Sequence, residues 1–277
     1  MLGRRKMAMA SAMAAATLVR PASAQTQPGE STFDAVRRSK RLRVGVVSAA
    51  PPYSYKANGN GDWQGLIVTC AGDLAAQLGA APVFVETVFG DGVLDLQSNK
   101  VDLFFGLNAT PQRALSIDFS APMFKHPFTL VYRDKKPPAT WDELDRPEVR
   151  ISVDLGGATD LFASAILPHA TLAKYRTLDE ATLALVAGKV DYQILTLMLS
   201  LAMLSKNPSV GRRAVPTPLY GAGVNIGVRR EPDHTWRDYV DVWLSYYKDL
   251  GLMRRTAIAS LAPFGATEAD LPQEFAL

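Results

Sequence analysis

Hydrophobic and polar residues alternate along the chain in two rhythms, which predict strands followed by helices. Short runs rich in β-branched residues predict strands at 42–47, 82–87 and 101–106. Between them, apolar residues at helical spacing predict helices at 65–80 and 92–99. Strands that alternate with helices are typical of a mostly parallel sheet flanked by helices. The predicted fold class is therefore α/β.

The same order of elements returns in the second half of the chain. Residues 149–157 are predicted to form a strand followed by a glycine turn. Residues 180–195 are predicted to form a helix that ends at Gly188 and then a strand. The segments TWDE (140–143) and TLDE (177–180) both match the Ser/Thr-x-x-Glu capping box. The stretches QSNKVDLFFG and VAGKVDYQIL share a helix end, Lys-Val-Asp and a buried strand. Two similar units suggest two lobes of similar construction.

Two more helices are predicted near the C-terminus, at 234–249 and 252–261. The aromatic residues of 239–247 indicate a packing face. Three tryptophans are interpreted in the same way: Trp141, Trp236 and Trp243. Cys70, the only cysteine, lies in an apolar helical stretch and is predicted to be a small buried residue.

The first residues of the chain predict an export signal. Residues 1–24 have a basic start, a short apolar core and Ala-Ser-Ala before Gln25, as signal peptides do. The apolar run is too short and too rich in alanine for a membrane span. The pair Arg4-Arg5 leaves both the Sec and the twin-arginine routes open. Residues 25–39 are polar and are expected to be a flexible lead-in with room for a short helix.

The charge of the chain depends on this leader. Residues 1–24 hold four basic residues and no acidic one, so their removal changes the formal charge from +3 to −1. A mature chain of this charge does not predict binding to nucleic acid or to an anionic membrane. The three histidines, His126, His169 and His234, are far apart and lack the spacing of metal ligands. No metal or cofactor is predicted.

The stretch GLNATPQRALSIDFS (106–120) contains a locally unfavourable charge. Thr110 is a suitable N-cap and Pro111 suits the first helical position, which makes Arg113 roughly the third helical residue. A cation there meets the positive end of the helix dipole. The conflict can be relieved by solvent, or by an anion that the arginine and the free N–H groups hold together.

From Leu42 to Leu261 the chain resembles the family 3 periplasmic solute-binding proteins, which serve polar amino-acid ABC importers. The resemblance rests on LRVGV…PPYSY, GLIVTCAGDLAAQLG, GKVDYQIL, GAGVNIGVRR and, most specifically, on LQSNKVDLFFGLNATPQRALSIDFSAPMF. It implies a two-lobe fold with two hinge strands and a ligand cleft that closes by hinge motion. Lobe 1 would comprise 40–132 and 223–277, and lobe 2 would comprise 133–222. The protein would be a periplasmic monomer that delivers its ligand to a membrane permease.

The resemblance also implies a ligand site at the carboxyl ends of the strands, where α/β sheets usually bind ligands. Arg113 falls at the position that clamps the ligand carboxylate with its planar guanidinium. The other implied binding residues are Phe105, Gly106 and Asn108 from lobe 1, Gly157, Thr159 and Thr196 from lobe 2, and Phe89 over the ligand.

Three residues depart from the family pattern. Carboxylates that usually meet the ligand ammonium are replaced by Val47 and Thr196, and a frequent aromatic by Ala50. A buried ammonium without a counter-charge would cost several kcal/mol. Either another acid serves, with Asp160 or Asp154 the nearest, or the ligand is a carboxylate without an α-ammonium.

An enzyme is the main alternative to a binding protein, because a few members of the superfamily resemble periplasmic dehydratases. Such a reaction needs a positioned acid or base in the cleft. Thr196 stands where a carboxylate is wanted, and no histidine is expected in the cleft. A sensor domain is a weaker alternative, since no membrane segment follows Leu261. The sequence therefore favours a binding protein without catalytic activity.

Overall fold

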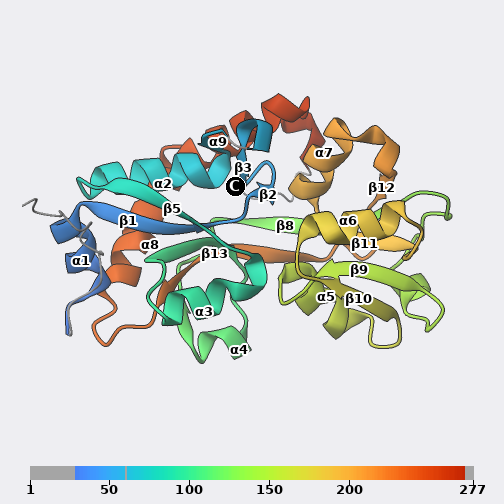
Figure 1. The fold of residues 1–277 in the computed structure, drawn as a ribbon, viewed down its shortest axis with the longest axis horizontal. Helices are drawn as coiled ribbons and strands as arrows, with labels where there is room; N and C mark the ends of the chain where they lie inside the picture. Colours follow the sequence, from blue (N-terminus) through green and yellow to red (C-terminus); the bar gives the residue numbers. More distant parts are fainter. Residues whose placement is uncertain (1–28, 60, 272–277) are drawn as a thin grey trace, which may run out of the picture.

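The computed structural model describes residues 29–59 and 61–271. The signal peptide predicted at 1–24 lies outside these residues. The described chain forms two α/β lobes, which lie side by side in Figure 1. The first lobe is built from the N-terminal elements and the last two helices, and the second lobe from the middle of the chain.

The first lobe contains a central sheet with helices on its faces. Its strands are β1 (Arg41–Val46), β5 (Ala81–Glu86), β6 (Leu103–Leu107) and β7 (Ile117–Phe119), with a small separate sheet of β2 (Ala49–Ala50), β3 (Ser54–Lys56) and β4 (Trp63–Gln64). Its helices are α1 (Thr32–Ser39), α2 (Leu66–Gln77), α3 (Gly92–Gln97), α4 (Pro111–Ala114), α8 (Thr235–Asp249) and α9 (Leu252–Leu261). The strands and helices predicted from the pattern between residues 42 and 106 are thus confirmed, with ends shifted by at most three residues.

The second lobe repeats this construction on a smaller scale. Its strands are β9 (Arg150–Asp154), β10 (Thr171–Tyr175), β11 (Tyr192–Thr196) and β12 (Arg212–Ala214), and its helices are α5 (Ala158–Ile166), α6 (Leu178–Val186) and α7 (Leu197–Lys206). Strand β9 pairs in parallel with β10 and β11, as β1 pairs in parallel with β5 and β6 in the first lobe.

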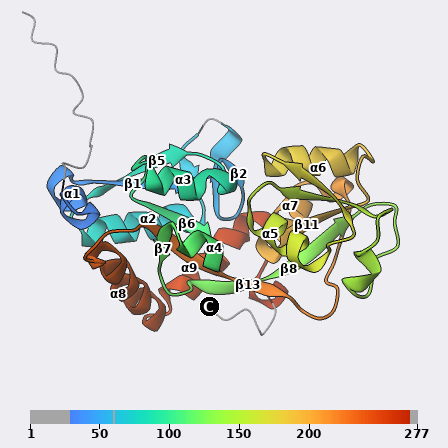
Figure 2. The same cartoon turned by 90° about the horizontal axis from the view of Figure 1, so that it is seen from below.

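Two long strands, β8 (Phe124–Tyr132) and β13 (Gly221–Arg229), connect the lobes. Their first halves pair with each other. The second half of β8 then pairs with β11 and β12 in the second lobe, and that of β13 with β6 and β7 in the first lobe. Figure 2 shows these strands running along one side of the molecule between the lobes. This is the two-lobe arrangement expected from the sequence, while the residue boundaries 132/133 and 222/223 stay a prediction.

The repeated Lys-Val-Asp segment performs the same structural task in both lobes. In the first lobe, the Asp102 carboxylate accepts hydrogen bonds from the backbone N–H of Arg43 at 2.7 Å and from its Nη2 at 2.5 Å. In the second lobe, Asp191 accepts the same two bonds from Arg150, each at 3.0 Å. Each aspartate therefore ties its strand to the neighbouring parallel strand, and the predicted internal similarity is real.

One of the two predicted capping boxes is confirmed and the other is wrong. Thr177 and Glu180 exchange the expected bonds at the start of α6. At 140–143 the chain forms only a short 3₁₀ turn, Asp142–Leu144, without a side-chain cap. The reason is that Thr140 forms a β-bridge with Thr217, which commits its backbone to an extended pairing.

The lead-in expected at 25–39 contains the short helix for which the sequence left room. Residues 32–39 form α1, which is docked on the first lobe, so the expected flexibility is wrong for these residues. Residues 25–28 lie outside the described part of the chain, and their flexibility stays a prediction. The buried Glu231 carboxylate accepts the Thr32 hydroxyl at 2.5 Å and its backbone N–H at 2.9 Å. Buried Ala35 and Val36 add an apolar contact face. A charge-assisted anchor of this kind fixes the helix.

The predicted packing residues are confirmed except for Tyr246 in the stretch 239–247, which is 59% exposed. Trp141, Trp236, Trp243 and Cys70 are all buried. Burial raises the pKa of the Cys70 thiol to about 12, so this cysteine is an inert core residue. In the described ranges, no helix combines the length and the apolar character of a membrane span.

Candidate ligand-binding site

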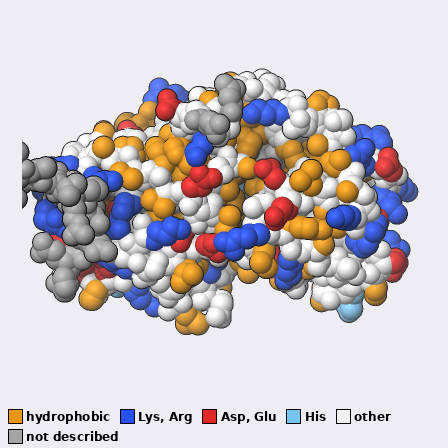
Figure 3. Space-filling view, in the orientation of Figure 1, with side chains coloured by type: hydrophobic (Ala, Val, Ile, Leu, Met, Phe, Trp, Pro, Cys, Tyr) orange, Lys and Arg blue, Asp and Glu red, His pale blue; other side chains and the backbone are white. Residues whose placement is uncertain are grey.

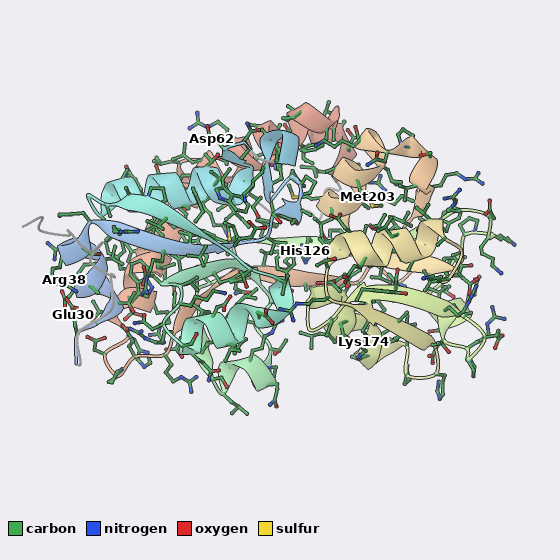
Figure 4. All side chains as sticks on the ribbon, viewed as in Figure 1. Glu30, Arg38, Asp62, His126, Lys174 and Met203 are labelled. Atoms are coloured by element: carbon green, nitrogen blue, oxygen red, sulfur yellow. The ribbon has the colours of Figure 1, made fainter. Side chains whose placement is uncertain are left out.

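A cavity lies between the lobes, and the space between its surrounding atoms is about 480 Å³ when the open solvent at its mouth is counted. It is lined from both lobes and from the two connecting strands. The lining residues are Tyr53, Ile67, Phe89, Gly106, Leu107, Asn108, Arg113, His126, Asp154, Ala158, Thr159, Thr196, Leu199 and Val224. Figure 4 shows one of them, His126, near the middle of the molecule where the lobes meet. A mostly apolar cavity with a few convergent polar groups is typical of a small-molecule site.

Arg113 is held in the cavity by local helix chemistry and by both lobes. The Thr110 hydroxyl accepts the Arg113 backbone N–H at 3.2 Å, and Pro111 begins the short helix α4 as expected. The guanidinium donates from Nη1 to the Asn108 carbonyl at 3.1 Å and from Nη2 to the Gly156 carbonyl at 2.7 Å. These two bonds use only part of its five N–H donors. The remaining donors can bind a carboxylate.

Asp154 brings a negative charge to the same cavity from the end of β9. The residue is only 7% exposed, and burial raises the pKa of its carboxyl group to about 6, while the Thr159 hydroxyl, which donates to Oδ1, opposes this shift. The carboxylate lies so close over the following turn that a Cβ on Gly157 would be 1.6 Å from Asp154 Oδ2. Glycine at 157 is therefore required for this position of the aspartate.

Arg113 and Asp154 thus place opposite charges in one cavity, each from a different lobe. Burial lowers the pKa of the Arg113 guanidinium, and the Asp154 charge counteracts this shift. The arginine nevertheless directs its hydrogen bonds to the two carbonyls and not to the aspartate. A zwitterionic ligand offers a carboxylate to Arg113 and an ammonium to Asp154.

Neutral polar groups line another part of the cavity. The Tyr53 hydroxyl and His126 Nδ1 are 3.2 Å apart. Burial raises the pKa of the Tyr53 phenol far above its ordinary value, and the neighbouring Thr196 hydroxyl opposes the shift. Burial also lowers the pKa of His126 to about 3, so the imidazole is neutral at pH 7. These side chains form hydrogen bonds without adding charge.

Six of the eight predicted binding residues line the cavity. They are Phe89, Gly106, Asn108, Arg113, Thr159 and Thr196. Gly106 has a φ of +91°, which favours glycine, and Phe89 lies over it. The Thr159 hydroxyl proton is directed to Asp154 and so supports the site indirectly.

The two other predicted residues do not line the cavity. Side chains alternate along a strand, and Phe105 of β6 faces α8, where its ring packs against Trp243 at a centroid distance of 6.3 Å. Gly157 is the N-cap of α5 and contributes by accommodating Asp154.

Of the two acids that the sequence left open, only Asp154 lines the cavity. Asp160 lies away from the lining, where its carboxylate accepts bonds from Lys174 at 2.7 Å and Ser164 at 3.0 Å. Val47 and Ala50 are buried in the core of the first lobe, outside the lining. Asp154 is the only acidic side chain among the described residues that line the cavity.

Sequence reasoning missed Tyr53 and His126, and the expectation that no histidine lies in the cleft is wrong. A signal was present for both. His126 is a polar residue in the strand FKHPFTLVY, most of whose residues are apolar, and Tyr53 follows the proline pair of PPYSY. A polar residue in a mostly apolar strand often marks a site.

The lobes also touch beside the cavity. Arg176 Nη2 of the second lobe lies 2.7 Å from Asp91 Oδ2 of the first lobe. A Cβ on Gly90 would be 2.5 Å from the Leu155 carbonyl oxygen, so only glycine permits this backbone approach. Figure 3 shows acidic and basic side chains gathered near the middle of this face. The ion pair therefore joins the lobes at the rim of the cavity.

Loss of this ion pair should weaken ligand binding modestly. Arg176 is largely solvated at 66% exposure and Asp91 is partly solvated at 37%, so the pair contributes at most about 1 kcal/mol. Because it favours contact between the lobes, Arg176→Gln should lower ligand affinity about two- to fivefold at low salt. Calorimetric titration checks this, with Arg146→Gln as control, since Arg146 pairs with Glu148 inside one lobe. Equal affinity of Arg176→Gln and wild type at low salt would contradict the role.

Comparison with known proteins identifies the family. Residues 42–256 match the family of bacterial extracellular solute-binding proteins, family 3. The chain is 29% identical over 248 residues to cyclohexadienyl dehydratase of Pseudomonas aeruginosa, covering 87% of this chain and 90% of the relative. It is 25% identical to the solute receptor for L-cysteine of Neisseria gonorrhoeae, with a TM-score of 0.77 and coverage of 88% and 98%. An ancestral amino acid-binding protein, a precursor of cyclohexadienyl dehydratase, shares the fold at 24% identity, with a TM-score of 0.73 and coverage of 84% and 99%. The chain therefore belongs to family 3 of the bacterial extracellular solute-binding proteins.

Proposed function

We propose that this protein is the extracytoplasmic solute-binding component of an ABC importer and that it binds a small amino acid between its lobes. The observation that supports this most is the placement of Arg113 and Asp154, which line one cavity from opposite lobes. Family membership agrees with this role, and the L-cysteine receptor of Neisseria gonorrhoeae is a similar protein that binds an amino acid.

The two charged side chains can hold both ends of a zwitterion. The Arg113 guanidinium presents a planar fork that matches a carboxylate and forms charge-assisted hydrogen bonds with it. Asp154, with a pKa of about 6, is mostly ionised at pH 7 and offers a counter-charge to an ammonium. A ligand that binds both side chains bridges the lobes and favours closure.

A thermal-shift screen of the purified protein tests this proposal. The compounds are the L-amino acids and, for each, the α-keto acid with the same side chain. A ligand that binds only the folded state raises the melting temperature by linkage. At least one amino acid should raise it more than its keto acid does. No shift with any amino acid at millimolar concentration would contradict the proposal.

The proposed location requires export and cleavage of the leader. Mass spectrometry of the intact protein from a periplasmic extract should give a chain that begins at Gln25. A chain that still begins at Met1 would contradict export by a cleaved signal. The protein should be a monomer that passes its ligand to a membrane permease, as is usual for importers of this type.

A dehydratase is a second candidate, favoured by the buried acid of the cavity. A dehydratase must protonate a departing hydroxyl group, and a carboxyl group with a pKa of about 6, such as that of Asp154, can donate a proton near neutral pH. The similarity to cyclohexadienyl dehydratase gives the reaction to test. Loss of water from a hydroxylated cyclohexadiene can yield an aromatic ring, which ultraviolet absorbance detects. Turnover that is abolished by Asp154→Asn would favour the enzyme over the binding protein.

A further inference from the structure

Three buried polar atoms of the cavity have no hydrogen-bond partner within the described parts of the chain. They are Asn108 Oδ1, His126 Nε2 and Thr196 Oγ1, on residues that are 6%, 4% and 3% exposed. Buried polar atoms in native proteins are nearly always paired, because an unpaired one costs about 1–3 kcal/mol. Three such atoms around one cavity point to a group that a ligand brings.

The orientations of Asn108 and His126 are fixed by the bonds that these two side chains do make. Asn108 donates from Nδ2 to the Gly223 carbonyl at 2.6 Å, which leaves its acceptor oxygen for the cavity. His126 bonds Tyr53 through Nδ1, which leaves Nε2. The imidazole is packed between Phe124 and Phe128, with ring centroids at 6.4 and 5.9 Å. The unpaired atoms of Asn108 and His126 therefore belong to side chains that are held in place by their other contacts.

The group that meets them must be uncharged. Among the lining residues only Arg113 and Asp154 carry charge, and both are assigned to the ends of the zwitterion. The apolar lining residues include Ile67, Leu199 and Val224. A charged ligand side chain placed here would lack a counter-charge and would be costly to desolvate.

The unpaired atoms also determine whether the ligand group must donate or accept hydrogen bonds. Asn108 Oδ1 only accepts, so the ligand group must donate. When Tyr53 donates to Nδ1, His126 Nε2 carries the imidazole proton and donates, so a ligand group that bonds it accepts, while the Thr196 hydroxyl can donate or accept. A hydroxyl does both with a single atom.

We propose that Tyr53, His126, Thr196 and Asn108 form a polar subsite that recognises a hydroxyl on the ligand side chain. This inference rests on the proposed function and adds the ligand class, a hydroxylated amino acid. The subsite would make specificity depend on one neutral group, because a site built to bond a hydroxyl strongly rejects the analogue without it.

Calorimetric titrations with matched pairs test the subsite. The pairs are L-serine and L-alanine, L-threonine and L-valine, and L-tyrosine and L-phenylalanine, which differ mainly by the hydroxyl. In at least one pair the hydroxylated member should bind at least about tenfold more tightly to the wild-type protein.

The variants Thr196→Val and Tyr53→Phe each remove one hydroxyl of the subsite with little change of shape. Each should reduce the preference for the hydroxylated member at least about threefold. Thr69→Val is the matched control, because Thr69 is exposed on α2 and lies outside the lining; it should keep the wild-type preference.

The outcomes separate this inference from the proposed function. Binding of amino acids that requires Arg113 but shows no preference in any pair would overturn the subsite alone. A preference that persists unchanged in both variants would do the same. If no amino acid binds, the proposed function fails and the subsite fails with it.

Discussion

Arg113→Ala should lower the affinity for the amino acid about a hundred- to a thousandfold and leave the fold intact. The substitution removes the only cationic side chain among the described lining residues, and the loss of one partner of a buried charge pair costs about 2–5 kcal/mol. No core cavity results, because the guanidinium reaches into the ligand cavity and bonds only the Asn108 and Gly156 carbonyls. The measurements are calorimetric titration and thermal unfolding.

Two further variants test whether this effect depends on the shape of the guanidinium and on its place in the cavity. Arg113→Lys should also bind poorly, at least about tenfold more weakly than wild type, because an ammonium is a point charge and cannot reproduce the planar fork. Arg255→Ala, on the exposed face of α9, removes an arginine outside the cavity and should bind as wild type does. If Arg113→Ala and Arg113→Lys both kept wild-type affinity, the carboxylate would be bound elsewhere.

Asp154→Asn should reverse the preference between an amino acid and its α-keto acid. The amide has nearly the same shape and still fits above Gly157, but it offers no counter-charge to an ammonium. Affinity for the amino acid should fall at least about thirtyfold, while affinity for the keto acid should be unchanged or rise. Paired titrations of both ligands against both proteins measure this. A wild-type protein that binds the keto acid as well as the amino acid would show that Asp154 does not meet an ammonium.

The raised pKa of Asp154 adds a pH dependence with a definite sign. In the ligand-free protein this pKa is about 6 against an ordinary 3.8, so the folded state holds the proton more tightly than the unfolded state does. Stability therefore falls as the pH rises from about 4 to about 6. A bound ammonium favours the ionised carboxylate, so affinity for the amino acid should rise over the same window. In Asp154→Asn this rise should be absent.

Local patterns predicted much of the fold because the decisive interactions are local or repeated. The Lys-Val-Asp segments predicted equivalent strands, and Asp102 and Asp191 indeed bond equivalent arginines. The same reasoning failed at 140–143, where a distant residue, Thr217, competes for the backbone. It also failed to anticipate the docking of α1, which depends on Glu231 about 200 positions away in the chain. Contacts between remote segments leave no pattern in a local window.

The residues of the site also divide into those that a local pattern could indicate and those that depend on contacts between remote segments. Arg113 could be singled out because Thr110 and Pro111 place it in a helix start where a cation is unexpected, and the family resemblance implied its role at the ligand carboxylate. Tyr53 and His126 could not, because they meet only when the loop after β1 and the connecting strand β8 come together. The choice between Asp154 and Asp160 likewise required the structure, since both lie near one turn and only their directions differ.

A crystal structure of the protein with the amino acid that gives the largest thermal shift tests the central claim most directly. The account predicts the ligand in the cavity between the lobes. Its carboxylate should lie on the Arg113 guanidinium and its ammonium on the Asp154 carboxylate, each at about 2.7–3.0 Å. A ligand bound outside this cavity, or inside it with its carboxylate away from Arg113, would contradict the account.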